Sequence, residues 1–287
     1  MRHVSSLVVS LTAIITMALP GIASAAGQFP GSGGQYHIPN ANPANGEKIF
    51  NEGKGSAPPC TSCHGADGTG NEAIGAPRLA GQYFSFLLKQ LNDFANFEKV
   101  KGDAGGFVFK GRKDLTLGQM NGIASALSEQ DRRDVAAFLA EKRVKFAGTN
   151  LKQLKEQGKQ VGDIAKGKSL VKWGQGERGI PACKSCHGYN GRGAPPLFPL
   201  IGQQRYSYLV NQLKYWRKGA ESGNPEEGRI NDPMAAMREV AKNLTDEDIH
   251  NAAAYLTRAP LFGPGDIRTP YANLVKSQRR FEFATTE

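Results

Sequence analysis

The sequence has 287 residues, with 36 lysines and arginines against 26 acidic residues, which gives a formal net charge of +10. The mean hydropathy is −0.43, and no apolar run is long enough for a mature membrane span, so a polytopic membrane protein is excluded. The contents of 8% aromatic and 22% charged residues exclude an acidic, aromatic-poor disordered chain. Glycine is frequent, at 35 residues, which indicates many loops and an interior filled partly by something other than side chains.

The N-terminal segment over 1–25 has the three-part plan of a secretory signal peptide. It contains a short basic start, an apolar charge-free stretch over 7–19 and an A-x-A cleavage sequence at 23–25. A retained N-terminal anchor is the alternative, but the apolar stretch is shorter than the roughly 20 residues of a span. We therefore expect cleavage after Ala25, an N-terminal extension over 26–42 that is rich in Gly, Asn and Pro, and a protein located in the periplasm.

All four cysteines lie in two CxxCH pentapeptides, one with Cys60, Cys63 and His64 and the other with Cys183, Cys186 and His187. This is the attachment pattern of c-type haem: two thiols form thioethers with the porphyrin vinyl groups, and the adjacent histidine becomes an axial ligand of the iron. A thioredoxin-like motif would need a βαβ setting that is missing here. Neither a four-cysteine zinc site nor two disulfides would need a histidine directly after each pair. We expect two covalently bound haem c groups per chain.

The two motifs belong to a tandem duplication. The positions that correspond are Gly46 and Phe50 with Gly167 and Val171 at an offset of 121, Cys60 with Cys183 at 123, Gln82 and Gln90 with Gln204 and Gln212 at 122, and Met120 and Leu127 with Met237 and Leu244 at 117. The small changes of offset fall where loops are expected to differ. The sequence therefore predicts two copies of one unit of roughly 100 residues, which is a common domain size.

The repeat boundaries define the domains that we expect. The first unit covers 43–148 and the second covers 161–259. A basic linker over 149–160 joins them, and a C-terminal tail over 260–287 follows the second unit.

Each unit is predicted to be mostly helical. In the first unit, helices are expected over 45–52, over 82–97, where apolar residues recur at helical spacing, and from Ser128 onward. Ser128 and its counterpart Thr245 are good N-caps, and acidic residues follow each of them in the first helical turn. No sustained alternation of polar and apolar residues is present, so the fold class is all-α.

Three methionines remain after removal of the signal, namely Met120, Met234 and Met237, and each lies in the loop before a capped last helix. A thioether is a suitable sixth ligand for haem iron and raises its reduction potential. Met120 lies seven residues before Leu127, and Met237 lies seven before Leu244. We therefore expect Met120 and Met237 to be the axial ligands. Met234, three residues earlier, could face the haem from the same helical turn and is a packing residue or a substitute ligand.

Two further histidines are not expected to bind iron. His37 lies in the N-terminal extension. His250 lies in the last helix of the second unit, where an exposed position is expected.

The tandem CxxCH units, each with a methionine seven residues before a Leu-Ser or Leu-Thr helix start, resemble dihaem class I cytochromes c of the cytochrome c4 family. Residues 76–82 (APRLAGQ) resemble the Pro-x-Leu-x-Gly-Gln segment of that family, and 198–204 resemble it more loosely. The resemblance covers about 45–258. It implies two tandem cytochrome c domains related by a pseudo-twofold axis, and carbonyl groups of Pro77 and Pro199 that accept a hydrogen bond from the proximal histidine rings.

The resemblance also implies electron transfer in the periplasm, without enzymatic activity, between redox proteins such as membrane-bound or soluble donors and acceptors, a terminal oxidase among them. A cytochrome subunit of a dehydrogenase or oxidase complex is an alternative. A dihaem peroxidase or a thiosulfate-oxidising enzyme is another, but such enzymes need an open or labile distal position, and the His/Cys-ligated kind needs a spare cysteine.

The stretch over 142–172 contains nine lysines and arginines but only two acidic residues. This basic run is either a solvated linker or a surface that steers the chain towards an acidic redox partner or an anionic membrane surface. Export argues against a nucleic-acid partner.

Overall fold

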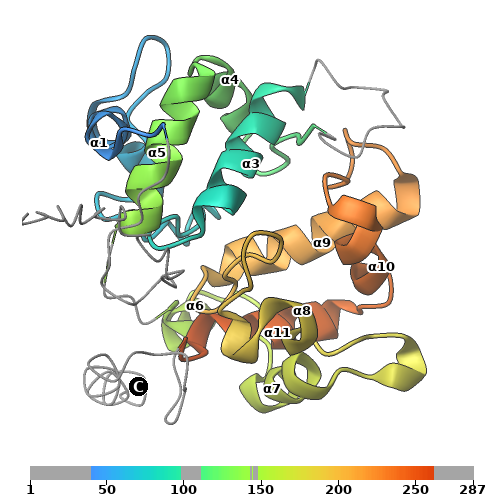
Figure 1. The fold of residues 1–287 in the computed structure, drawn as a ribbon. Coiled ribbons are helices and arrows are strands. Elements are labelled where there is room, and N and C mark those ends of the chain that lie inside the picture. The colour runs from blue at the N-terminus through green and yellow to red at the C-terminus, as the bar shows by residue number, and fades with distance from the viewer. Residues whose placement is uncertain (1–39, 98–110, 143, 145–147, 262–287) are drawn as a thin grey trace, which may run out of the picture.

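In a computed structural model of the protein, the structure describes residues 40–97, 111–142, 144 and 148–261. The described part is helical and contains only isolated β-bridges in place of strands. Figure 1 shows two groups of helices, one above the other, with α3 and α9 between them. The predicted all-α fold class is confirmed. Among the described residues, no helix has the length and apolar character needed to cross a bilayer.

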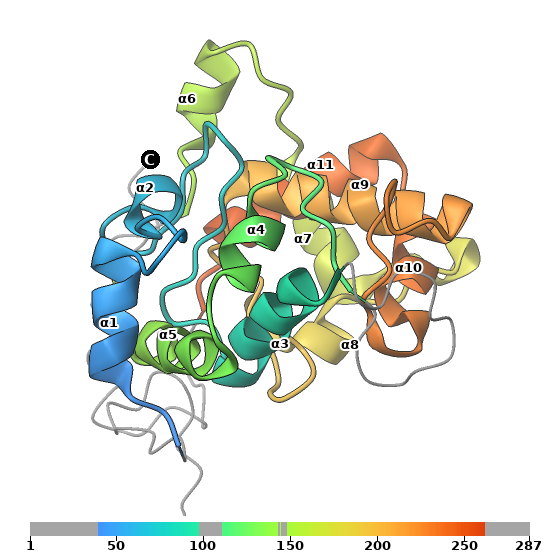
Figure 2. The same ribbon diagram turned by 90° about the horizontal axis from the view of Figure 1, so that it is seen from above.

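The first unit contains α1 (Pro43–Glu52), α2 (Thr61–His64), α3 (Phe84–Ala95), α4 (Met120–Ser125) and α5 (Glu129–Glu141). The second contains α7 (Ile164–Trp173), η2 (Gly176–Arg178), α8 (Lys184–His187), η3 (Tyr189–Gly191), α9 (Tyr206–Ser222), η4 (Pro233–Ala235), α10 (Ala236–Ala241) and α11 (Asp246–Arg258). In the sequence, α6 (Leu151–Glu156) lies between the two units, and in the view from above it projects to one side of the molecule (Figure 2). The predicted signal peptide and most of the predicted extension and tail lie outside the described residues.

The last helix of each unit begins where the sequence predicts. Ser128 caps α5 and Thr245 caps α11, and each forms a capping box with the aspartate three residues later, Asp131 or Asp248. In such a box the cap oxygen accepts from a backbone N–H, and the carboxylate accepts from the cap N–H. The basic linker contains α6, because Asn150 caps that short helix and Leu154 is buried against the second unit.

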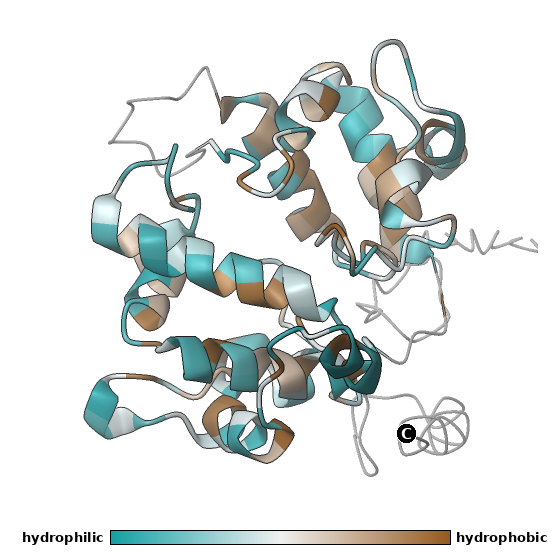
Figure 3. Ribbon diagram, turned by 180° about the vertical axis from the view of Figure 1, so that it is seen from behind, coloured by the Kyte–Doolittle hydropathy of each residue, from teal (hydrophilic) through white to brown (hydrophobic). Residues whose placement is uncertain are grey.

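Each unit has a core in which its first and last helices cross closely. Ile49 and Phe50 of α1 pack against Val135 and Leu139 of α5, and all four side chains are buried. The crossing requires a glycine, because a Cβ atom at Gly46 would lie 2.1 Å from the Asp134 carbonyl oxygen. A Cβ atom at the corresponding Gly167 of α7 would lie 1.8 Å from the Asn251 carbonyl oxygen of α11, so this crossing also requires a glycine. Figure 3 shows hydrophobic and hydrophilic segments following one another along the helices, as expected for helices with one buried side.

The two units meet through reciprocal hydrogen bonds. The Gln82 side chain donates to the Leu200 carbonyl at 2.8 Å and accepts from the Leu200 N–H at 3.0 Å. The Gln204 side chain donates to the Arg78 carbonyl at 2.9 Å and accepts from the Arg78 N–H at 2.6 Å. Leu200 and Arg78 differ by the same offset of 122 as the two glutamines. This exchange is the pattern of a twofold interface, in which residue i contacts j and j contacts i.

A second reciprocal cluster lies between α3 and α9. The Arg112 guanidinium donates to the side-chain oxygens of Gln90 at 2.7 Å and Gln212 at 2.8 Å. Arg229, its counterpart at an offset of 117, donates to the same two oxygens at 2.8 and 2.7 Å. All four side chains are buried. Two guanidinium groups are therefore held close together in the interior, across the contact between the units.

Candidate haem-binding sites

In the first unit, the short helix α2 places His64 in the interior. The His64 side chain is buried, and its Nδ1 atom lies 3.0 Å from the Pro77 carbonyl oxygen. A carbonyl can only accept, so Nδ1 carries the hydrogen and Nε2 keeps its lone pair. Burial lowers the pKa of His64, which keeps the ring neutral. A neutral imidazole with a fixed tautomer is the form in which histidine ligates a metal.

The second unit repeats this arrangement. His187 at the end of α8 is buried, and its Nδ1 atom lies 2.9 Å from the Pro199 carbonyl oxygen. Burial again lowers the pKa of the ring. The Phe198 ring stands edge-on to the imidazole at a centroid distance of 6.0 Å. Both units therefore present one buried imidazole with Nε2 available.

The four cysteines lie beside these histidines, and no disulfide joins them. Burial raises the pKa of Cys60 and of Cys183 to about 11, so both are protonated before any attachment reaction. Cys63 is half-buried and Cys186 is exposed. Among the described residues, no three His, Cys, Asp or Glu side chains gather as a metal ion would require.

The structure separates the two methionines of the second unit. Met237 is half-buried in the first turn of α10, as Met120 is at the start of α4. Met234 is 79% exposed and lies in η4 with φ +53°, before α10 begins. The expectation that Met234 and Met237 share one helical turn is therefore wrong, because the left-handed backbone at Met234 interrupts the helix.

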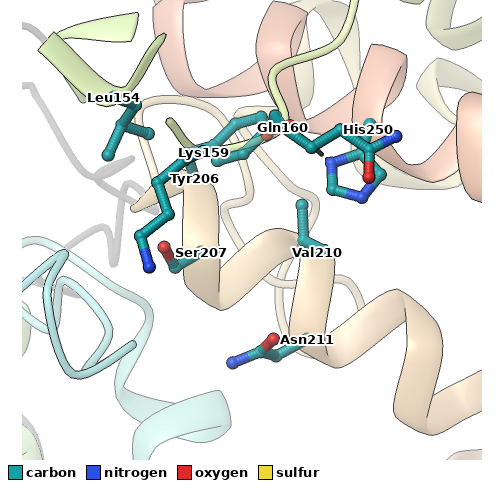
Figure 4. Close-up of a pocket in the computed structure, with 8 residues that line it drawn as sticks. All are labelled: Leu154, Lys159, Gln160, Tyr206, Ser207, Val210, Asn211 and His250. Carbon is teal, nitrogen blue, oxygen red and sulfur yellow. Dashed lines mark hydrogen bonds between the residues drawn. The ribbon is translucent and has the colours of Figure 1, made fainter. Parts of the chain in front are cut away.

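The expectation that His250 is exposed is also wrong. His250 is buried, and its Nδ1 atom lies 2.7 Å from the Tyr206 hydroxyl. The same hydroxyl contacts the Gln160 carbonyl at 3.1 Å, so the pair fixes the end of the linker to the second unit. A cavity of about 160 Å³ adjoins them, and its lining residues are shown in Figure 4. Residue spacing could not have revealed this contact, because it joins positions 44 residues apart.

Comparison with known proteins assigns the family. The sequence model of the cytochrome c family matches residues 43–142 and 164–259. A thiosulfate dehydrogenase electron acceptor from Stutzerimonas stutzeri is 34% identical over 75% of this chain and 86% of that protein. A cytochrome c4 from Pseudomonas aeruginosa is 30% identical over 88% of this chain and 98% of that protein. The crystal structure of reduced cytochrome c4 from Pseudomonas stutzeri has a TM-score of 0.56 at 29% identity, covering 76% of this chain and 98% of that chain.

The chain belongs to the cytochrome c family. With its two tandem domains it is similar to dihaem cytochrome c4, and it carries two covalently bound haem c groups. The residues present fit that group: in each unit, two thiols stand next to a buried imidazole whose Nε2 lone pair is available.

The reciprocal interface residues were not predicted as functional. The internal repeat does indicate two pairs of them, because the polar residues Gln82 and Gln90 recur as Gln204 and Gln212. Arg112 and Arg229 also keep the offset of the methionines, but their meeting across the two units depends on tertiary packing.

Proposed function

We propose that this protein is an exported electron carrier whose two haems are each ligated by a histidine and a methionine. His64 and Met120 ligate one iron, and His187 and Met237 ligate the other. The proposal rests on one arrangement that occurs in both units. The histidine Nδ1 donates a hydrogen bond to a proline carbonyl, and a methionine lies at the start of the short helix before the capped last helix, which is α4 in the first unit and α10 in the second. The signal-like segment over 1–25 supports export to the periplasm.

The protein residues supply orientation and electrostatics. The Pro77 and Pro199 carbonyls hold the imidazole rings and fix their tautomers. Haem c supplies one-electron iron chemistry when bound, and a thioether ligand favours the reduced state. If a histidine and a methionine hold each iron, no position would remain for a substrate, and the chain would transfer electrons without catalysing a reaction of its own.

The buried guanidinium groups of Arg112 and Arg229 contribute positive charge near the contact between the units. Among the described residues, no carboxylate forms an ion pair with Arg112 or Arg229. Burial and the neighbouring Arg112 lower the pKa of Arg229 to about 9, so Arg229 remains cationic at neutral pH. Buried charge needs compensation. Asp93 and Asp232 supply part of it, since both act to raise the pKa of Arg229. The propionate carboxylates of the haems would supply more when the haems are bound.

Carbon monoxide binding tests the proposal. Six-coordinate irons with methionine ligands bind carbon monoxide poorly, so the reduced protein is expected to show little adduct and no turnover with peroxide or thiosulfate. Rapid adduct formation on either haem would favour the peroxidase or thiosulfate-oxidising alternative.

A more specific form of the proposal is that the chain accepts electrons from a thiosulfate-oxidising dehydrogenase, as its similarity to a thiosulfate dehydrogenase electron acceptor suggests. Thiosulfate alone should then leave the haems oxidised, and thiosulfate with a catalytic amount of such a dehydrogenase should reduce them. Absence of reduction in the complete mixture would remove this candidate and leave the general carrier function intact.

A further inference from the structure

The two haem-attachment motifs lie in surroundings of different charge. In the second unit, α7 packs against α8 and η3. This packing gathers Lys168, Lys172, Trp173, Lys184 and Tyr189 around the CxxCH motif, and we call these five residues the α7–α8 face. Figure 1 shows α7 at the opposite end of the molecule from α1.

The cationic groups of the α7–α8 face are held on aromatic rings. The Lys184 ammonium lies 3.8 Å from the centroid of the Trp173 ring. The Lys172 ammonium lies 4.4 Å from the centroid of the Tyr189 ring and donates to its hydroxyl at 3.0 Å. Such cation–π contacts restrict the lysine side chains without neutralising them. Lys168, one turn before Lys172 on α7, is exposed and adds a third positive charge.

This face is exposed and its lysines are not neutralised. Trp173 is 72% exposed and Tyr189 is 46% exposed. Within the described part of the chain, no carboxylate forms an ion pair with Lys168, Lys172 or Lys184, whereas the nearby Glu247 is paired with Lys166. Large exposed aromatic residues beside cations are typical of binding hot spots.

The first unit provides an internal comparison. Its α1 corresponds to α7 residue for residue at an offset of 121, and its motif corresponds at 123. In place of Lys168, Lys172, Trp173, Lys184 and Tyr189 it has Glu47, Asn51, Glu52, Thr61 and Ala66. At these five positions the second unit therefore has three lysines, whereas the first unit has no lysine and two glutamates.

We propose that the α7–α8 face is the docking surface for a redox protein that carries carboxylates around its own electron-exchange site, and that such a partner exchanges electrons with the second unit in preference to the first. The proposal deepens the carrier function and rests on it. Each encounter transfers one electron between the acidic partner and the haem of the second unit, and no bond is formed or broken. Complementary charge raises the encounter rate and fixes the orientation.

The test uses the haem-loaded full chain and reduced flavodoxin, a small acidic flavoprotein, as the electron donor in stopped-flow kinetics. The variant K168E/K184E reverses two charges on the α7–α8 face. The control K152E/K155E makes the same change on two exposed lysines of α6. Haem content and reduction by dithionite establish that each variant is intact.

At low ionic strength, we expect K168E/K184E to lower the second-order rate by about 10-fold or more. The control should change the rate by less than about 2-fold, and the three rates should converge at ~0.5 M salt, where charges are screened within a few ångströms. Equal losses in both variants, an unchanged rate in K168E/K184E, or a wild-type rate independent of salt would overturn the proposal.

Two further outcomes distinguish protein docking from membrane binding, and failure of docking from failure of the carrier function. If K168E/K184E kept its rate with flavodoxin but lost binding to phosphatidylglycerol vesicles, the face would be a membrane contact and the proposal would be wrong. If dithionite could not reduce the wild-type haems, the carrier function itself would fail, whereas failure of docking alone leaves that reduction normal.

Discussion

Gln82 and Gln204 occupy the same position in the two units, and each binds the backbone of the opposite unit through both its amide nitrogen and its amide oxygen. Both side chains are buried. One pair of residues thus holds the segments that follow the two CxxCH motifs against each other, and these segments contain the proline carbonyls that orient the histidines. The interface between the units and the two haem sites therefore share the same backbone segments.

Replacing Gln204 by Ala should therefore destabilise the protein. The change removes the two hydrogen bonds that the Gln204 side chain forms with the Arg78 backbone in the interior, which costs about 1–3 kcal/mol. Gln82→Ala should cost a similar amount for the same reason. Denaturant unfolding of the haem-loaded protein measures both, with Gln153→Ala on the exposed side of α6 as the control. A loss no greater than that of the control would show that the reciprocal bonds contribute little.

The close helix crossing predicts a severe effect of a single methyl group. Gly167→Ala would place a Cβ atom 1.8 Å from the Asn251 carbonyl oxygen, so α7 and α11 would have to separate. We expect a loss of at least about 2 kcal/mol in the free energy of unfolding. Gly176→Ala, where a Cβ atom would meet no other atom within 4 Å, should change stability by less than about 0.5 kcal/mol. Similar unfolding midpoints for the two variants would contradict this packing.

His250 should make stability depend on pH. Burial lowers the pKa of this histidine in the folded protein below its usual value of 6.5. The unfolded chain therefore binds the proton more readily, and stability is lost as the pH falls below about 6.5, by up to about 1.4 kcal/mol per pH unit. In His250→Gln this slope should become smaller between pH 7 and 5, whatever the change in overall stability. An unchanged slope would mean that His250 does not titrate on unfolding.

The outcome for His250 illustrates what the sequence can and cannot reveal. The CxxCH motifs, the repeat and the caps at Ser128 and Thr245 are local patterns, and they predict the fold class and the helix starts. The burial of His250 depends on Tyr206, and the interruption at Met234 depends on a left-handed backbone. Neither residue spacing nor composition encodes such features, because tertiary packing determines them.

The methionine assignment gives opposite predictions for two neighbouring residues. Met237→Ala should abolish the sulfur-to-iron charge-transfer band of the second haem and lower its reduction potential, because a thioether ligand is lost. Met234→Ala should leave the band and the potential in place, since Met234 is 79% exposed before the helix begins. Optical spectra and redox titration of the two variants measure this, and the reverse pattern would overturn the register of the repeat.

The most direct measurement is the number of methionine-ligated haems in each polypeptide. A pyridine haemochrome assay gives the haem content, and the sulfur-to-iron charge-transfer band of the oxidised protein, compared in wild type, Met120→Ala and Met237→Ala, gives the number of haems with a thioether ligand. We predict two haems per polypeptide and a band that loses about half its intensity in each single variant and disappears in the double variant. One haem per polypeptide, or a band that survives in the double variant, would contradict the proposal of two His/Met-ligated haems.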